Sequence, residues 1–428
     1  MGLVLLHSKL NAQFHGVKDS RYGESVEHFR GIQYGSISHR FATPHPVADF
    51  GGQAVDATRF GLSPRASPLC PQVVLDTGYL LRLPGESDDA DLSYDEFSCL
   101  NLNVHRPSHA STYGKLLPVL IWIHGGSQVM TFTPASSRVC DPTRIVAQSI
   151  SSKNPIIVIT VNYRLNVFAF GDWNCMKNLA LRDQRLAIEW VVRNIDEFNG
   201  DPGEQGKLTL AGESAGAVYV HAHTFLDAPV QSAILASGSL FLSPPAATET
   251  ANHMVKRLSE AAWKIAKVSL RDAPVAVLIQ ALSDCNITSM FLQSEPGLED
   301  WKTRDENVSR LMIGDVEYES ILWREGIEMM AADDIVGCFS QEHHHGAKLM
   351  ELYRINPSRP TQTKIGALDF INDVCFALPV EMIAQRWKAR KGEVYRYFLR
   401  QFLRECGCRF SAELDRLCEW TVALADSD

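Results

Sequence analysis

The segment from Leu208 to Ala217 constrains the fold of this chain more than any other. It reads Leu-Thr-Leu-Ala-Gly-Glu-Ser-Ala-Gly-Ala, an apolar run that breaks into Gly-x-Ser-x-Gly around Ser214. This pattern is typical of a nucleophile elbow, in which a strand ends, the chain turns sharply and a helix begins. Gly212 and Gly216 suit positions that leave no room for a Cβ atom. The segment therefore predicts a strand–turn–helix unit that exposes Ser214 as a nucleophile.

The flanking segments alternate between strand-like and helix-like patterns. Apolar runs typical of strands buried on both faces of a parallel sheet occupy 118–123, 155–161, 208–211 and 232–236. Between Leu179 and Phe198 the apolar residues recur at helical spacing, and residues 246–310 read as a helical insertion that covers the sheet. This alternation predicts an α/β fold with a mostly parallel central sheet and helices on both faces. We expect one domain over residues 1–428, divergent from about 400 to 428.

Composition excludes several classes of protein. The net charge of −9 argues against nucleic acid as a partner. No apolar run approaches the roughly 18 residues of a membrane helix, so we expect no membrane partner. The ten cysteines form no C-x-x-C pair or zinc spacing, which predicts no metal site, and no cofactor is expected. The N-terminal residues do not resemble a signal peptide, which predicts a cytoplasmic protein, or a secreted one if the N-terminus is incomplete.

A glycine-rich turn follows the strand-like run at 118–123. It reads His124-Gly125-Gly126-Ser127. A serine nucleophile needs hydrogen-bond donors for the oxyanion that forms on the substrate, and such a loop supplies them from its backbone. The sequence predicts that the N–H groups of Gly126, Ser127 and Ala215, with Gly125 adjacent, form an oxyanion hole.

Several motifs in register resemble one family. They are Phe29-Arg-Gly-Ile-Gln-Tyr-Gly, Asn162-Tyr-Arg, Asp183-Gln-Arg, Trp190-Val, Asn194-Ile, Gly200-Asp-Pro and Gly212-Glu-Ser-Ala-Gly-Ala. The chain resembles a type-B carboxylesterase of the cholinesterase-like α/β-hydrolase family, closest in style to fungal members, from about residue 10 to about 400. The resemblance implies an α/β-hydrolase fold. It also implies hydrolysis of small-molecule carboxylic esters through an acyl-serine intermediate.

The same resemblance implies roles for three further residues. The family's triad acid lies in a segment like G-x-x-x-x-E-G, and here the match from Gly314 places it at Glu319, with Ser320 where glycine is usual. The family also links two cysteines at the mouth of the site, which correspond to Cys70 and Cys99. We therefore expect Glu319 to be the orienting acid and Cys70–Cys99 to form a disulfide.

The general base is harder to assign. The family's catalytic histidine follows a strand like 394–398, yet this sequence contains no histidine after His345. His345 itself is a candidate base, although its neighbours resemble the start of a helix, and His221, His223 and His124 read as packing residues. Three interpretations remain open. The chain is an esterase with an unassigned base, a catalytically inactive esterase-like binding protein, or a truncated or misspliced reading of an active esterase.

Overall fold

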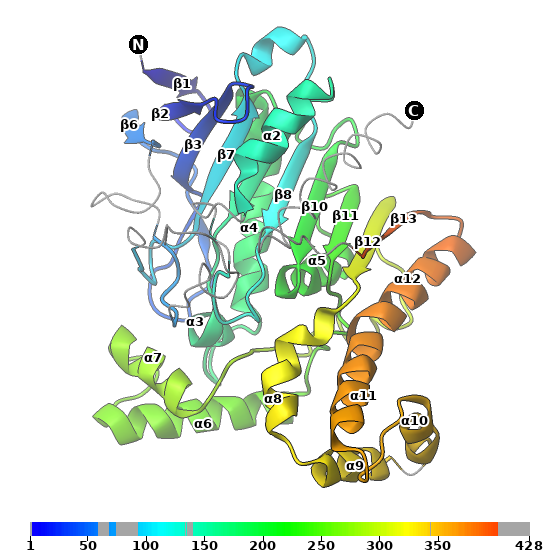
Figure 1. Ribbon diagram of the computed structural model, residues 1–428. Helices are drawn as coiled ribbons and strands as arrows, with labels where there is room; N and C mark the ends of the chain where they lie inside the picture. The colour runs from blue at the N-terminus through cyan, green and yellow to red at the C-terminus, as the bar shows by residue number, and fades with distance from the viewer. Residues whose placement is uncertain are drawn as a thin grey trace.

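The computed structural model describes residues 2–58, 68–73, 93–132, 134, 140–342 and 344–400. These residues form an 11-stranded sheet in the order β1-β2-β3-β7-β9-β8-β10-β11-β12-β13, with β6 paired to β2 (Figure 1). The strands are β1 (Leu3–His7), β2 (Ala12–Asp19), β3 (Val26–Gln33), β6 (Gln53–Asp56), β7 (Asn101–Pro107), β8 (Val119–Ile123), β9 (Ile157–Val161), β10 (Leu208–Glu213), β11 (Ser232–Ala236), β12 (Arg310–Val316) and β13 (Glu393–Leu399). A separate pair joins β4 (Gly35–Ser36) and β5 (His45–Pro46).

The six neighbouring strands β9, β8, β10, β11, β12 and β13 run parallel to one another. The N-terminal strands add antiparallel pairs. The prediction of a mostly parallel α/β sheet is therefore confirmed. The predicted strand-like runs correspond to β8, β9, β10 and β11. In β9 and β11 every residue is buried, as expected for strands covered on both faces.

Helices cover both faces of the sheet (Figure 1). On one face, α2 (Pro142–Ser151) packs against the sheet in an apolar cluster. Val146 of α2 belongs to this cluster, as do Leu120 of β8 and Val158 of β9. The opposite face packs against α4 (Leu179–Asn194), α5 (Ala215–Phe225) and α12 (Leu378–Ala389). A 3₁₀ turn, η4 (Ile195–Phe198), extends α4 to the predicted end of that helix.

Except for η2 (Ala110–Tyr113), which links β7 to the start of β8, the remaining helices lie beyond the carboxyl ends of the parallel strands (Figure 1). The segment predicted to be a helical insertion contains α6 (Thr248–Ala266) and α7 (Val275–Asp284), while residues 285–309 contain no helix. The other elements are α3 (Asn166–Phe170), η5 (Glu319–Trp323), α8 (Arg324–Met329), α9 (Ala332–Ser340), α10 (Gly346–Leu352), α11 (Pro360–Asn372) and the π-helix η6 (Asp373–Ala377).

A buried ion pair joins the end of β9 to α4. Arg164 binds both carboxylate oxygens of Asp183, through Nε at 2.8 Å and Nη2 at 2.7 Å, and its Nη1 donates to the carbonyl of Ala42 at 2.7 Å. The side chains are 2% and 0% exposed. A buried charge that loses its partner is strongly destabilising, so this pair fixes the path of the chain that follows β9.

We expect Asp183→Ala to lower the free energy of unfolding by about 3–5 kcal/mol, because it leaves the Arg164 guanidinium buried without its counter-charge. Urea denaturation followed by tryptophan fluorescence measures this loss. The control is Glu189→Ala, which removes the exposed partner of Arg185 and should cost less than about 1 kcal/mol. Equal losses in the two variants would contradict the prediction.

Candidate active site

Ser214 lies at the junction between β10 and α5, in a backbone conformation that few residues adopt. Its φ of 55° and ψ of −122° lie in a sparsely populated region, and such a conformation costs about 1–3 kcal/mol, which the surrounding structure must supply. The Ser214 amide donates to the carbonyl of Ala236 at 2.9 Å, and its carbonyl accepts from Val218 at 3.1 Å. The side chain is half-buried. The strand–turn–helix geometry is that of a nucleophile elbow.

Four glycines make this sharp turn possible. A Cβ atom on Gly212 would lie 2.5 Å from the carbonyl carbon of Gly216, and one on Gly216 would lie 2.1 Å from the carbonyl oxygen of Ile123. A Cβ on Gly238 would lie 2.4 Å from the Ser214 carbonyl oxygen. On the other side of the serine, a Cβ on Gly125 would lie 3.2 Å from the Ser214 Cβ. The loop after β8 therefore adjoins Ser214.

That loop is a tight turn with three successive positive φ values. They are 119° at Gly126, 54° at Ser127 and 63° at Gln128. The Gly126 carbonyl accepts from the amides of Val129 at 3.0 Å and Met130 at 3.1 Å. Among the described residues, no hydrogen bond uses the amide hydrogens of Gly126 or Ser127. This leaves both groups available as donors to a bound oxyanion, as the oxyanion prediction requires.

The ring of His124 lies beneath this loop. It stacks on Tyr163, with ring centroids 4.4 Å apart and an angle of 13° between the planes. Its Nδ1 lies 2.9 Å from the carbonyl of Gly125, which can only accept, so Nδ1 carries the proton. Burial lowers the pKa of His124 to about 4. A neutral, fully hydrogen-bonded ring supports the loop, in agreement with the interpretation of His124 as a packing residue.

Glu319 is the first residue of η5, directly beyond β12. Its side chain is buried, and Oε1 accepts from the Val316 amide at 2.9 Å. Its own amide donates to Asn372 Oδ1 at 2.8 Å. Since one strand, β11, separates β10 from β12, the ends of these strands are about 10 Å apart. This spacing is compatible with an imidazole between Ser214 and Glu319, which stays a prediction.

Two other acids near Glu319 are less suited to the role of triad acid. Glu317 is exposed and forms an ion pair with Arg400 at 3.7 Å. Asp315 is buried within β12, and burial raises its pKa to about 6. The assignment of Glu319 as the triad acid remains a prediction, and these environments support it.

No hydrogen bond among the described residues joins a histidine ring to the Ser214 hydroxyl. His345 is exposed at the N-cap of α10, a helix that packs against α9 and lies apart from α5 in Figure 1. His343, the first residue of the histidine triplet, lies outside the described residues. The structure therefore gives His345 no contact with the elbow.

The two histidines of α5 are occupied in the core. The Nδ1 atom of His221 accepts from the amide of Leu240 at 3.1 Å, and Nε2 faces Glu306 at 3.4 Å. Nε2 of His223 lies 3.0 Å from Gln184 Oε1. Burial lowers the pKa of both rings, to about 3 for His223. Neither ring is available as a general base at neutral pH, as the sequence interpretation expected.

Cys70 and Cys99 are buried neighbours. Both are free thiols in the structure, and the hydrogen bond with Cys70, together with burial, raises the pKa of Cys99 well above its usual value. Cys70 Sγ also accepts from the Leu165 amide at 3.3 Å. The structure thus brings the two sulfur atoms together without a bond between them, and their oxidation to a disulfide stays a prediction.

No group of three or more His, Cys, Asp or Glu side chains in the described ranges is arranged to hold a metal ion. No helix in the described part of the chain is long and apolar enough to span a membrane.

Comparison with known proteins decides the family. The model of the carboxylesterase family matches residues 10–296. The chain belongs to the carboxylesterase family. Its fold is accordingly the α/β-hydrolase fold, and the resemblance stated from the sequence motifs is confirmed.

Three curated relatives illustrate the range of this carboxylesterase family. Lipase 1 of Yarrowia lipolytica is 27% identical over 367 residues, which cover 82% of this chain and 68% of the lipase. An inactive carboxylesterase-like protein, VdtD of Byssochlamys spectabilis, is 35% identical over 229 residues, which cover 50% of this chain and 36% of VdtD. Secreted lipase 1 of Botryotinia fuckeliana is 35% identical over 214 residues, which cover 46% of this chain and 35% of the lipase.

Sequence reasoning missed three residues of the carboxylesterase site. Gly238 packs against the Ser214 backbone, Asn372 binds the amide of Glu319, and Asn166 holds the loop after β8. Asn166 lies only two residues beyond the Asn-Tyr-Arg motif, but nothing in its neighbourhood marks it as special. Each contact joins segments that are far apart in the sequence, so no local pattern could predict it.

We expect Gly216→Ala to disrupt the elbow, because the new methyl group would push α5 away from the Ile123 carbonyl. The free energy of unfolding should fall by about 1–3 kcal/mol, and Ser214 should lose reactivity toward a fluorophosphonate. Urea denaturation and mass spectrometry of the labelled protein measure the two effects. Gly337→Ala in α9 is the control, since a Cβ there meets nothing within 4 Å. Normal labelling of the Gly216 variant would refute the close approach of α5 to β8.

Proposed function

We propose that this carboxylesterase acts on small-molecule carboxylic esters through an acyl intermediate on Ser214. The observation that carries this proposal is the strained elbow, which holds a half-buried serine beside a loop with two unused amide donors. A backbone conformation this costly persists when function requires it. The relatives named as lipases support the same class of substrate.

In the proposed reaction, Ser214 Oγ bonds to the carbonyl carbon of the ester. The carbonyl oxygen becomes an oxyanion and accepts hydrogen bonds from the amides of Gly126, Ser127 and Ala215. The intermediate then breaks its bond to the alkoxy oxygen, which leaves as the alcohol with a proton. Water next attacks the acyl-serine, releases the carboxylic acid and restores the hydroxyl.

Proton transfer limits this reaction in the 428-residue chain. The Ser214 proton requires a base, and Glu319 would orient and stabilise a charged imidazole between itself and the serine. No described histidine ring contacts the serine hydroxyl, so the proton would pass to solvent. Loss of one essential triad member costs on the order of a millionfold in turnover. Slow or undetectable turnover is therefore expected, with Ser214 still placed to react.

The test is p-nitrophenyl ester turnover by the 428-residue chain beside Ser214→Ala and His345→Ala. We expect feeble turnover that Ser214→Ala lowers to background and His345→Ala leaves unchanged, because His345 is exposed on α10. Robust turnover abolished by both substitutions would make His345 the base and refute the assignment above. Fluorophosphonate labelling, read by mass spectrometry, checks the reactivity of Ser214 separately from turnover.

A second candidate function is ligand binding without catalysis. Among the described residues no histidine contacts Ser214, which favours it, and one relative carries the word inactive in its name. Labelling separates the two proposals. A wild-type chain that binds esters in equilibrium dialysis but never forms an adduct at Ser214 would be a binding protein. Adduct formation that Ser214→Ala abolishes would support the esterase proposal.

We also propose a cytoplasmic location. There the neighbouring thiols of Cys70 and Cys99 would remain reduced, whereas in an oxidising compartment they would form the predicted disulfide. The opposing observation is that two relatives are named secreted lipases. We expect both thiols to be alkylated when the unreduced protein is isolated from its own cells and unfolded in iodoacetamide. Mass spectrometry measures this. If neither thiol is alkylated and the protein mass is lower by two hydrogens, Cys70 and Cys99 form a disulfide. That result would instead place the protein in an oxidising compartment.

A further inference from the structure

Asn166 sits at the start of α3, directly behind the loop after β8. It is 1% exposed and has a φ of 46°, a conformation that asparagine tolerates better than most residues. Its backbone amide donates to the carbonyl of Gln128 at 2.8 Å. Its side-chain Nδ2 donates to the carbonyls of Val129 at 3.0 Å and Pro71 at 2.9 Å. One buried residue therefore holds two successive carbonyls of the loop.

Peptide planarity carries this constraint to the oxyanion donors. In a trans peptide the C=O and the following N–H point in opposite directions. Asn166 holds the carbonyls of Gln128 and Val129. These carbonyls share their peptide planes with the N–H groups of Val129 and Met130, respectively. Both of these N–H groups donate to the carbonyl of Gly126. That carbonyl shares a peptide plane with the N–H of Ser127, so the direction of the Ser127 N–H is set through Asn166.

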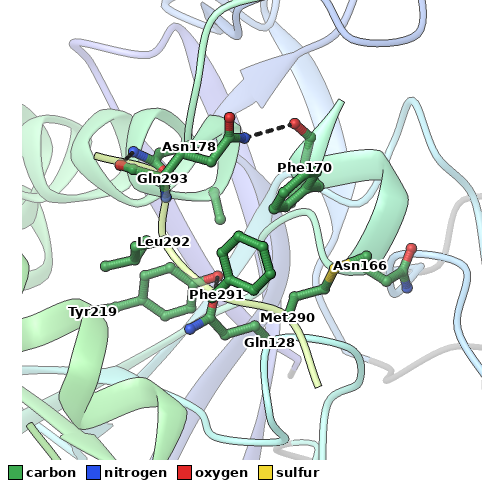
Figure 2. A pocket seen from close by; sticks show the side chains of 11 residues that line it. Gln128, Asn166, Phe170, Asn178, Tyr219, Met290, Phe291, Leu292 and Gln293 are labelled. Carbon is green, nitrogen blue, oxygen red and sulfur yellow. Dashed lines mark hydrogen bonds between the residues drawn. The ribbon is translucent and has the colours of Figure 1, made fainter. Parts of the chain in front are cut away.

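A small pocket adjoins the loop on this side. Asn166, Gln128 and Met290 line it, together with Asn178 and Tyr219, and it has room for about one water molecule (Figure 2). The hydrogen bonds of Asn166, and the bond from the Met290 amide to the Ser127 carbonyl at 3.0 Å, hold the strained turn beside this pocket.

We propose that Asn166 is a positioning residue for the oxyanion hole, acting through Gln128 and Val129 to aim the Ser127 amide at the cleft. This inference rests on the proposed function of Ser214 as a nucleophile. It requires no contact between Asn166 and substrate. The same residue should therefore influence the step in which the oxyanion forms, while leaving the initial binding of a reagent unchanged.

The test compares Asn166→Gly with Asn178→Gly. Asn178 is a matched control, because it is buried, has a φ of 52°, lines the same pocket, and bonds through its side chain to the backbone of Gln293. Glycine keeps the positive φ in both variants and removes only the side chain. The readouts are the inactivation constants of Ser214 with a fluorophosphonate and hydrogen exchange at the amides of Val129 and Met130.

For Asn166→Gly we expect the maximal inactivation rate to fall roughly tenfold or more, since losing an oxyanion donor costs roughly 10²–10³-fold in kcat. The half-saturating reagent concentration should stay the same, and exchange at Val129 and Met130 should accelerate. In Asn178→Gly the maximal rate should stay within about twofold of the wild type. Equal rates and equal exchange in the two variants would overturn the inference.

Failure of the proposed function gives a different result. A wild-type chain whose Ser214 never reacts would refute the nucleophile assignment, whatever happens at Asn166. The exchange measurement then decides the positioning role alone. Faster exchange at Val129 and Met130 in Asn166→Gly than in Asn178→Gly supports it, and unchanged exchange refutes it. A general loss of folding would lower the fraction of protein that reacts with the fluorophosphonate. It would leave the rate constant of the folded fraction unchanged, so it can be told apart from a loss of positioning.

Discussion

The positive φ of Ser214 is the constraint around which the rest of the site is arranged. A serine held at φ 55° requires that α5 start immediately after β10 and approach the neighbouring strands closely. Gly212, Gly216 and Gly238 allow that approach, because a side chain at any of them would collide with backbone atoms. The cost of the strained turn is offset by burial of α5, in which every residue is buried. The nucleophile is thus held by the core of the sheet.

A second arrangement connects the elbow to its surroundings through the segment 162–166. Its last four residues each reach a different part of the molecule. The Tyr163 hydroxyl donates to the carbonyl of His124 at 2.6 Å, Arg164 pairs with Asp183, and the Leu165 amide donates to Cys70. Asn166 then holds the oxyanion loop. Because β9 lies beside β8 in the sheet, the residues that leave its end can support the loop that leaves the end of β8.

The site combines the proposed serine nucleophile with an unassigned base. The elbow, the amide donors and the buried Glu319 are features of a carboxylesterase, yet the histidines in the described core have other partners. Burial keeps them neutral, which suits packing and opposes proton transfer. The Glu306 carboxylate is likewise bound to partners within the core. Burial alone would raise the pKa of Glu306. The hydrogen bond with His221 and the nearby charge of Arg386 have the larger, opposite effect and lower this pKa to about 2. The carboxylate pairs with Arg386 and Arg390 and faces His221.

The sequence by itself determined the fold class, the strands from β8 to β11 and the elbow, because these depend on local apolar patterns and on glycines with specific steric roles. It also indicated Glu319, through register with Gly314. Only the tertiary structure decided how Asn166, Gly238 and Asn372 serve the site, since each binds a segment distant in the chain. The sequence also indicated that His345 starts a helix, and the family resemblance implied that Cys70 and Cys99 are neighbours. Hydrogen bonds and close contacts between distant segments leave no periodic trace in a sequence, whereas burial of strands and helices does.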